Sequence, residues 1–124
     1  MGCRLHSATK YEVKYSSDGN FNWGQTYINP IISCLSDGDF WCDNSDYIEG
    51  ATILEASRAN LFKNIDKIIT PNNEWENQEE LNELINDMEN DANYHIDRNY
   101  LYQSLKSLIE QSDNNCNYIH FCWF

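Results

Sequence analysis

Apolar and polar residues alternate at the beginning of the chain and again at its end. In the stretch KYEVKY, Tyr11, Val13 and Tyr15 alternate with charged residues, a period of two that is typical of a half-buried strand. The turn-forming stretch SSDGN follows and FNW alternates again, so we expect a hairpin over residues 8–27. Both alternating faces of the closing stretch CNYIHFCWF are apolar, which predicts a central or covered strand. The stretch DFWC is expected to form another brief strand.

Between these strands, apolar residues recur at helical spacing. In NPIISCL, Asn29 is expected to cap a short helix that has Pro30 at its first position. A longer helix is expected from Ser45, with Pro71 as its stop. Two further helices are expected, one in the stretch NEWENQEELNELINDMENDAN and one from Asp97 to Gln111. The apolar stripes of the three long helices are Tyr47, Ala51, Leu54, Leu61, Ile65 and Ile68; then Leu81, Leu84, Ile85, Met88 and Ala92; then Leu101, Leu105, Leu108 and Ile109.

This order of elements predicts an α+β fold. We expect a small antiparallel sheet, made of the N-terminal hairpin plus the C-terminal strand, that is covered on one face by about three helices. The length of 124 residues predicts a single domain over residues 1–124, large enough for its own hydrophobic core.

The balance of charge narrows the choice of partners. The chain has 20 acidic and 8 basic residues, so its formal net charge is −12. A protein that binds nucleic acid directly, or an anionic membrane surface, needs the opposite sign. The composition therefore predicts a basic protein as the partner, with no direct contact to nucleic acid or membrane.

The acidity is concentrated in residues 73–93, which hold eight carboxylates and no Lys or Arg. On a continuous helix these charges span about 26 Å, or one per about 3 Å, close to the ~3.4 Å between phosphates along one DNA strand. A solvated helix face is the alternative interpretation, but like charges four residues apart destabilise a helix, and we favour a partner-binding surface. Its expected residues are Glu74, Glu76, Glu79, Glu80, Glu83, Asp87 and Asp91.

A second acidic stretch, SDGDFWCDNSDYIEG, also has no basic residue. Its carboxylates are expected to extend the partner-binding surface, and Trp41 and Trp75 are expected to anchor it, with edge-of-core aromatic residues as the alternative interpretation. Calcium is the other candidate ligand, but Trp41 and Cys42 occupy positions five and six of the loop, which excludes the EF-hand pattern. The expected partner-binding acids are Asp37, Asp39, Asp43 and Asp46.

Other chemistry has only weak sequence support. The five cysteines form no disulfide framework, so we expect free thiols in a reduced, cytoplasmic protein. Zinc is conceivable if the end strands pair, but no knuckle motif exists, so no metal and no cofactor are expected. No nucleophile elbow or phosphate-binding loop is present, and we expect that the protein is not an enzyme. The zinc candidates are Cys3, His6, Cys116, His120 and Cys122.

In charge and size alone, the chain resembles small acidic inhibitors, the nucleic-acid mimics with which phages counter host restriction or CRISPR nucleases. The resemblance implies an anti-restriction or anti-CRISPR inhibitor that occupies the basic groove of a nuclease or other nucleic-acid-binding protein. One alternative is an immunity protein or antitoxin for a basic nuclease toxin. An alternative of another class is a small metal-binding protein or hydrolase that uses the Asp-rich loop or the Cys/His set.

Overall fold

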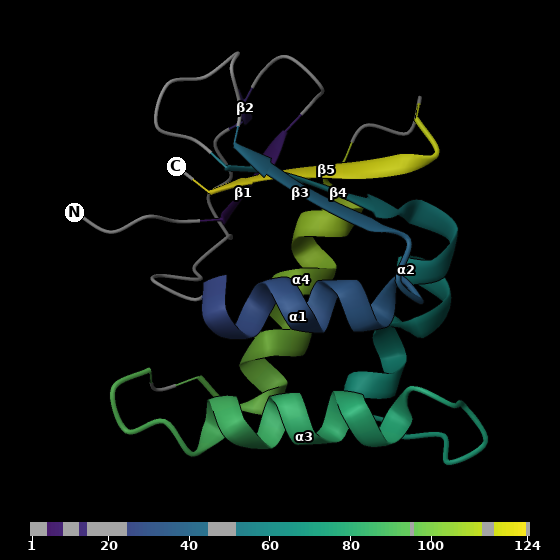
Figure 1. The fold of residues 1–124 in the computed structure, drawn as a ribbon, viewed down its shortest axis with the longest axis vertical. Helices are drawn as coiled ribbons and strands as arrows, with labels where there is room; N and C mark the ends of the chain where they lie inside the picture. Colours follow the sequence, from purple (N-terminus) through teal and green to yellow (C-terminus); the bar gives the residue numbers. More distant parts are fainter. Residues whose placement is uncertain are drawn as a thin grey trace.

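The chain folds into an antiparallel sheet with helices packed against one of its faces (Figure 1), which confirms the expected α+β class. The computed structural model describes residues 5–8, 13–14, 25–44, 52–94, 96–112 and 116–123. Within these residues, no helix combines the length and the apolar character needed to cross a membrane.

The sheet has five strands in the order β2-β1-β5-β4-β3, and every neighbouring pair is antiparallel. The closing stretch forms the middle strand, and both of its faces are buried: Phe121 lies on the helix-covered face, and Cys122 lies on the other with none of its surface exposed. The expected central strand is thus confirmed. The strands are β1 (Leu5–Ala8), β2 (Val13–Lys14), β3 (Phe40–Asn44), β4 (Thr52–Ser57) and β5 (Tyr118–Trp123).

The first hairpin begins earlier than the alternation pattern indicates. Strand β2 coincides with the centre of KYEVKY, but its partner is β1, in a register that places Ser7 opposite Lys14. Strand β1 also pairs with β5, so the two ends of the chain lie side by side in the sheet. The second strand expected at FNW lies outside the described residues.

Four α-helices and one 3₁₀ helix accompany the sheet in the described part of the chain. The last helix agrees with its prediction: Asp97 is the N-cap, and its side chain accepts a hydrogen bond of 2.8 Å from the backbone N–H of Tyr100. The helices are α1 (Gln25–Leu35), α2 (Arg58–Asn64), the 3₁₀ helix η1 (Ile65–Ile68), α3 (Gln78–Glu89) and α4 (Arg98–Glu110).

The helix expected from Ser45 is wrong over residues 52–57, which form strand β4. Leu54 and Leu61 are seven residues apart, a distance that also fits a helix. In the structure Leu54 and Ala56 alternate with more exposed residues, as in a strand, and both are buried against the helices. Helix α2 begins only after Ser57, whose hydroxyl accepts a hydrogen bond from the backbone N–H of Asn60.

The role expected for Asn29 and Pro30 is also wrong. Helix α1 begins at Gln25, so Asn29 is not its N-cap and Pro30 lies inside the helix. Proline there removes one backbone hydrogen bond, and its exposed position keeps the ring out of the core. Four fully buried residues pack α1 into the core: Ile28, Ile31, Ile32 and Leu35.

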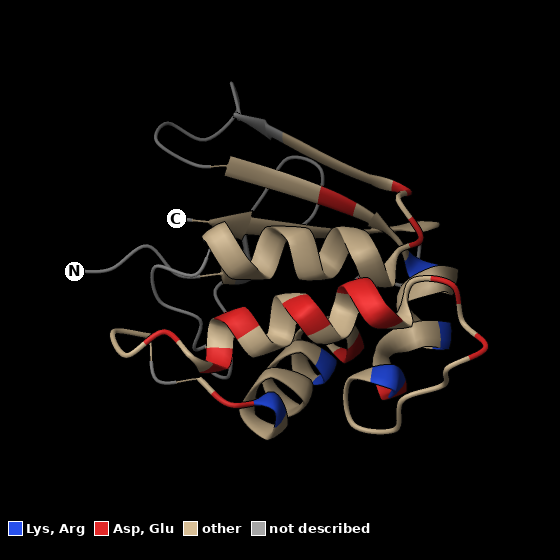
Figure 2. Cartoon of the chain, turned by 60° about the horizontal axis from the view of Figure 1, so that its bottom comes forward, with Lys and Arg blue, Asp and Glu red and all other residues tan. Residues whose placement is uncertain are grey.

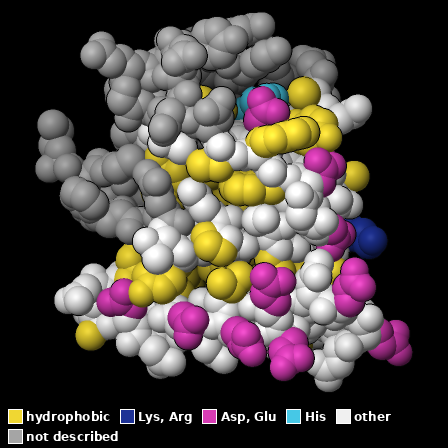
Figure 3. Space-filling view, in the orientation of Figure 1, with side chains coloured by type: hydrophobic (Ala, Val, Ile, Leu, Met, Phe, Trp, Pro, Cys, Tyr) yellow, Lys and Arg dark blue, Asp and Glu magenta, His cyan; other side chains and the backbone are white. Residues whose placement is uncertain are grey.

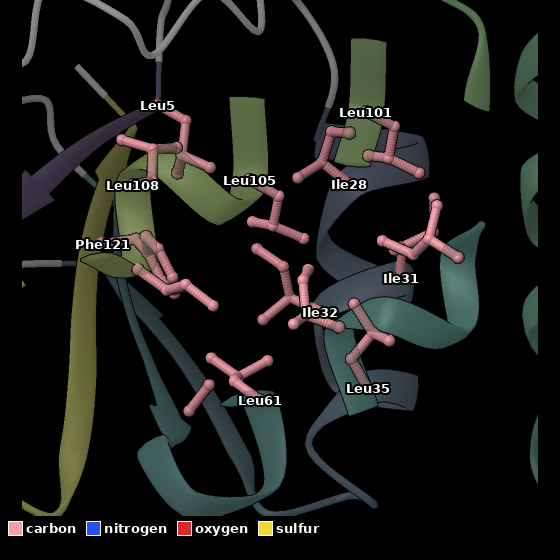
Figure 4. Packing of buried hydrophobic residues seen from close by; sticks show 14 of the residues in the cluster. Leu5, Ile28, Ile31, Ile32, Leu35, Leu61, Leu101, Leu105, Leu108 and Phe121 are labelled. Carbon is pink, nitrogen blue, oxygen red and sulfur yellow. The ribbon is translucent and has the colours of Figure 1, made fainter. Parts of the chain in front are cut away.

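The core lies between the sheet and helices α1, α2 and α4. Figure 4 shows Phe121 and Leu5 of the sheet pointing toward Leu105 and Leu108 of α4 and toward Ile32 of α1. Helix α3 packs on the side of α1 away from the sheet (Figure 1), where it buries Leu81, Ile85 and Met88. This arrangement places α3 at the outer edge of the molecule.

Candidate protein-binding surface

Helix α3 presents most of the acidic stretch to solvent. Its buried side turns toward α1, which leaves five carboxylates exposed. Figure 2 shows these acidic positions along α3. The described basic residues lie on other elements, namely β2, α2, η1 and α4. Within the described part of the chain, no Lys or Arg side-chain nitrogen lies within 4 Å of an α3 carboxylate. The exposed carboxylates are Glu79, Glu80, Glu83, Asp87 and Glu89.

The helix is shorter than the acidic stretch. It begins at Gln78, so Glu74 and Glu76 lie exposed in the preceding turns, and Glu76 does not share a helix with Glu80, four residues later. Ala92 lies beyond the helix and is exposed, which corrects its assignment to the apolar stripe.

The charge spacing nevertheless stays close to the one expected. A helix of 12 residues is about 18 Å long, so its five carboxylates lie one per about 3.6 Å along the axis. Phosphates follow one DNA strand at ~3.4 Å. The pairs Glu79/Glu83 and Glu83/Asp87 are four residues apart, where like charges repel each other and destabilise the helix.

The two acidic stretches meet at Asp37. This residue lies in the turn between α1 and β3 with a φ of 56°, a left-handed conformation that Asp tolerates better than most residues. Its Oδ1 accepts hydrogen bonds from Trp75 Nε1 at 3.1 Å and Asn77 Nδ2 at 3.0 Å. Its Oδ2 accepts another from Asn64 Nδ2 at 3.2 Å. Asp37 thus fastens the turns that precede α3 to the turn that follows α1, and we call this arrangement the Asp37 clasp.

Acidic side chains therefore form one band rather than two clusters. Figure 3 shows a row of them along α3 and further ones along the side of the molecule up to the sheet. Asp39 continues the band beyond the clasp, where its carboxylate accepts a hydrogen bond from the Tyr118 hydroxyl at 3.2 Å. That hydrogen bond and the negative charge of Asp39 raise the pKa of Tyr118. The side chains of Asp43 and Asp46 lie outside the described residues.

The two candidate tryptophans differ in their surroundings. Trp75 is half-buried against the core, and its indole N–H donates a hydrogen bond to Asp37. Lys67 Nζ lies 4.5 Å from the centroid of the Trp75 ring. These contacts fit an edge-of-core aromatic residue. Trp41 is 63% exposed, the most exposed large apolar side chain in the described part of the chain. Its surroundings fit an interface anchor.

Helix α1 separates the sheet from α3 and carries no charged residue. Asp91, the last acid of the expected set, lies at its flank and accepts a hydrogen bond from the Tyr27 hydroxyl. This bond, followed by burial and the charges of Asp91 and Asp87, raises the pKa of Tyr27. Burial, followed by the charges of Glu80 and Asp37, raises the pKa of the Cys34 thiol to about 12.

An open groove follows the flank of α3 that faces away from α1. It has a volume of about 450 Å³, and carboxylates and amides line it beside the Trp75 ring. Glu76, Glu79 and Glu83 supply the carboxylates, whereas Glu80 and Asp87 lie nearer to α1, where their charges act on Cys34 and Tyr27. The acidic surface therefore covers both flanks of α3.

The Cys/His candidates do not form a recognisable metal centre among the described residues, where no group of three His, Cys, Asp or Glu side chains converges. The end strands do pair, with His6 opposite Cys122 in the register, but the His6 side chain and Cys3 lie outside the described residues. His120 instead lies 3.4 Å from Oε1 of Glu55. Cys34, Cys42, Cys116 and Cys122 form no disulfide in the part of the chain that the structure describes.

Glu55 and Tyr118 belong to the acidic and aromatic surroundings of Trp41, although the sequence did not single them out for this role. Glu55 lies directly opposite Trp41 across the β3–β4 pair, and the Tyr118 ring centroid lies 6.4 Å from that of Trp41. Strand parity would have found Glu55 once residues 52–57 were known to be a strand.

Comparison of the chain with protein-family models, with curated proteins and with solved structures gives no match. The acidic band and Trp41 are therefore the features from which a function can be inferred.

Proposed function

We propose that this chain is a cytoplasmic inhibitory binding protein that occupies the basic, nucleic-acid-binding groove of a partner by imitating the charge of nucleic acid. The partner is a nuclease or another nucleic-acid-binding protein, as in phage counter-defence against restriction or CRISPR nucleases. The observation that carries the proposal is the exposed, uncompensated row of carboxylates on α3, with a charge spacing close to that of a DNA strand.

Two features of the surface support binding rather than simple solubility. The like-charge pairs on α3 cost helix stability, which a solvated face with mixed charges avoids. The Asp37 clasp joins the α3 row to Asp39, so the band follows a rigid scaffold rather than independent loops. A fixed acidic surface attracts a basic partner over a distance and orients it during approach.

The test is a pair of double variants that remove the same charge from different places. Glu79→Gln with Glu83→Gln neutralises α3, and Asp66→Asn with Glu110→Gln neutralises two carboxylates of η1 and α4. Each double variant changes the formal net charge from −12 to −10. All four residues are exposed, and the asparagine that replaces Asp66 keeps an oxygen that can accept the hydrogen bond from the Tyr102 hydroxyl.

Each variant is immobilised and used to capture proteins from a candidate host lysate at low salt, with duplex DNA as competitor. We expect the wild type and the η1/α4 variant to retain the same nucleic-acid-binding protein, which duplex DNA displaces. The α3 variant should associate with that protein at least about threefold more slowly, while the free energy of unfolding rises by about 0.2–0.5 kcal/mol per relieved pair. Equal association of both double variants at every salt concentration would refute a role for α3.

A further inference from the structure

Trp41 lies on the face of the sheet that the helices leave uncovered. The register across the sheet places Trp41 opposite Glu55, and Glu55 opposite His120, so these three side chains lie in one row across β3, β4 and β5. Leu54 and Phe121, on the neighbouring positions, face the helices. An indole that is 63% exposed at this place has no structural role in the core, which leaves it available to a partner.

Carboxylates lie close to this indole. Glu55 is 34% exposed, and its Oε1 lies 3.4 Å from Nε2 of His120. In the next row, the Tyr118 ring lies beside Trp41 with an interplanar angle of 54°, and its hydroxyl donates to Asp39. The result is an aromatic platform, formed by Trp41 and Tyr118, that has an acidic side chain in the same row and another at its far end.

We propose that this platform binds an arginine side chain of the basic partner, with the guanidinium stacked on Trp41 and donating to Glu55. A guanidinium is planar and weakly hydrated, so it stacks on an indole and hydrogen-bonds to a carboxylate at the same time. A lysine ammonium is strongly hydrated and cannot stack. A nucleic acid has negative phosphates, which the net charge of −12 repels, and a second copy of the chain would bring Glu55 and Asp39 against a surface of the same net charge.

This inference rests on the proposed function, because it identifies a second contact for the same partner. The acidic band runs from α3 through Asp37 and Asp39 toward the platform. A partner that follows the band reaches Trp41 at the sheet. The carboxylates of α3 then supply attraction that depends on charge alone, and Trp41 supplies discrimination between arginine and lysine.

The probes are nona-arginine and nona-lysine peptides, which carry the same charge. Their dissociation constants are measured by calorimetry at fixed salt for the wild type, for Trp41→Leu and for Glu79→Gln with Glu83→Gln. We expect the wild type to prefer nona-arginine, and Trp41→Leu to reduce that preference by about two- to fivefold while it binds nona-lysine like the wild type. Because Trp41 is largely exposed, an unchanged thermal melt is expected for this variant and serves as the folding control.

The Trp41 variant and the α3 double variant separate this inference from the proposed function. A preference for nona-arginine that Trp41→Leu retains in full, or no preference in the wild type, overturns the arginine platform while the α3 surface stands. If each peptide binds the α3 double variant as tightly as it binds the wild type, the proposed function is contradicted instead. Loss of nona-lysine binding in Trp41→Leu would show that the indole acts without discrimination and would also overturn the platform.

Discussion

The Asp37 clasp gives the most detailed prediction for stability. Three side-chain N–H groups, from Trp75, Asn77 and Asn64, donate to one carboxylate across 38, 40 and 27 residues of sequence. We predict that Asp37→Ala destabilises the protein and loosens residues 72–77, which carry two of the acids and the tryptophan that precede α3.

The magnitude follows from what each donor can do without Asp37. Asn64 is fully buried but keeps a hydrogen bond of 2.8 Å to the carbonyl of Leu35, whereas Trp75 and Asn77 are half-buried and can reach water. The hydrogen bonds are therefore worth about 1–2 kcal/mol together. Alanine in the left-handed conformation adds a further ~1 kcal/mol, because its Cβ approaches the following carbonyl. Asp37→Ala should therefore cost about 2–3 kcal/mol in total.

Two matched variants separate these contributions. Asp37→Gly removes the acceptor but tolerates the positive φ, so it should cost about 1–2 kcal/mol. Asp37→Asn keeps both an acceptor oxygen and tolerance of the conformation, so it should cost about 1 kcal/mol or less. Urea denaturation gives the free energies of unfolding, and hydrogen exchange of residues 72–77 reports the clasp itself. An Asp37→Gly variant as stable as the wild type, with unchanged exchange in residues 72–77, would show that the hydrogen bonds to Asp37 do not hold these residues.

Two further predictions concern the sheet and the cysteines. Deleting residues 118–124 should abolish cooperative thermal unfolding, because β5 is the middle strand of the sheet. Its buried Ile119, Phe121 and Trp123 each contribute about 1.5–3 kcal/mol to the stability of the fold. An unchanged melt would contradict this prediction. At about pH 8 the exposed Cys42 and Cys116 should react with iodoacetamide in the native protein, whereas the buried Cys122 should react only after unfolding. Cys34 should also react only after unfolding, because its pKa of about 12 leaves almost no thiolate. Native Cys34 that reacts as fast as Cys42 would contradict the burial of that thiol.

The sequence was informative where one local signal dominated. Helix α4 has an aspartate cap and a leucine stripe, and β5 is apolar on both faces, so both elements were predictable from short windows. The prediction for residues 52–57 was wrong because Leu54 and Leu61 fit a helical spacing by coincidence. Two competing signals agree with the structure: the adjacent β-branched residues Thr52 and Ile53 favour a strand, and Ser57 favours a helix that begins after it.

The candidate site was predictable in composition and not in geometry. The density of carboxylates on residues 79–89 follows from the pattern of residues, which did not distinguish the exposed Trp41 from the half-buried Trp75. The Asp37 clasp joins residues about 40 positions apart through side-chain hydrogen bonds, which leave no periodic trace in the sequence. The same holds for Glu55 beside Trp41, because that contact depends on the pairing of β3 with β4.

According to the proposed function, the acidic band takes the place of nucleic acid on a partner. A competition experiment tests this function: the partner captured by the wild type is purified and mixed with fluorescent duplex DNA and increasing amounts of this protein. We predict mutual exclusion, in which the protein displaces the DNA completely and the α3 double variant requires a higher concentration to do so. A stable ternary complex, in which the partner holds the DNA and this protein together, would contradict the proposed function.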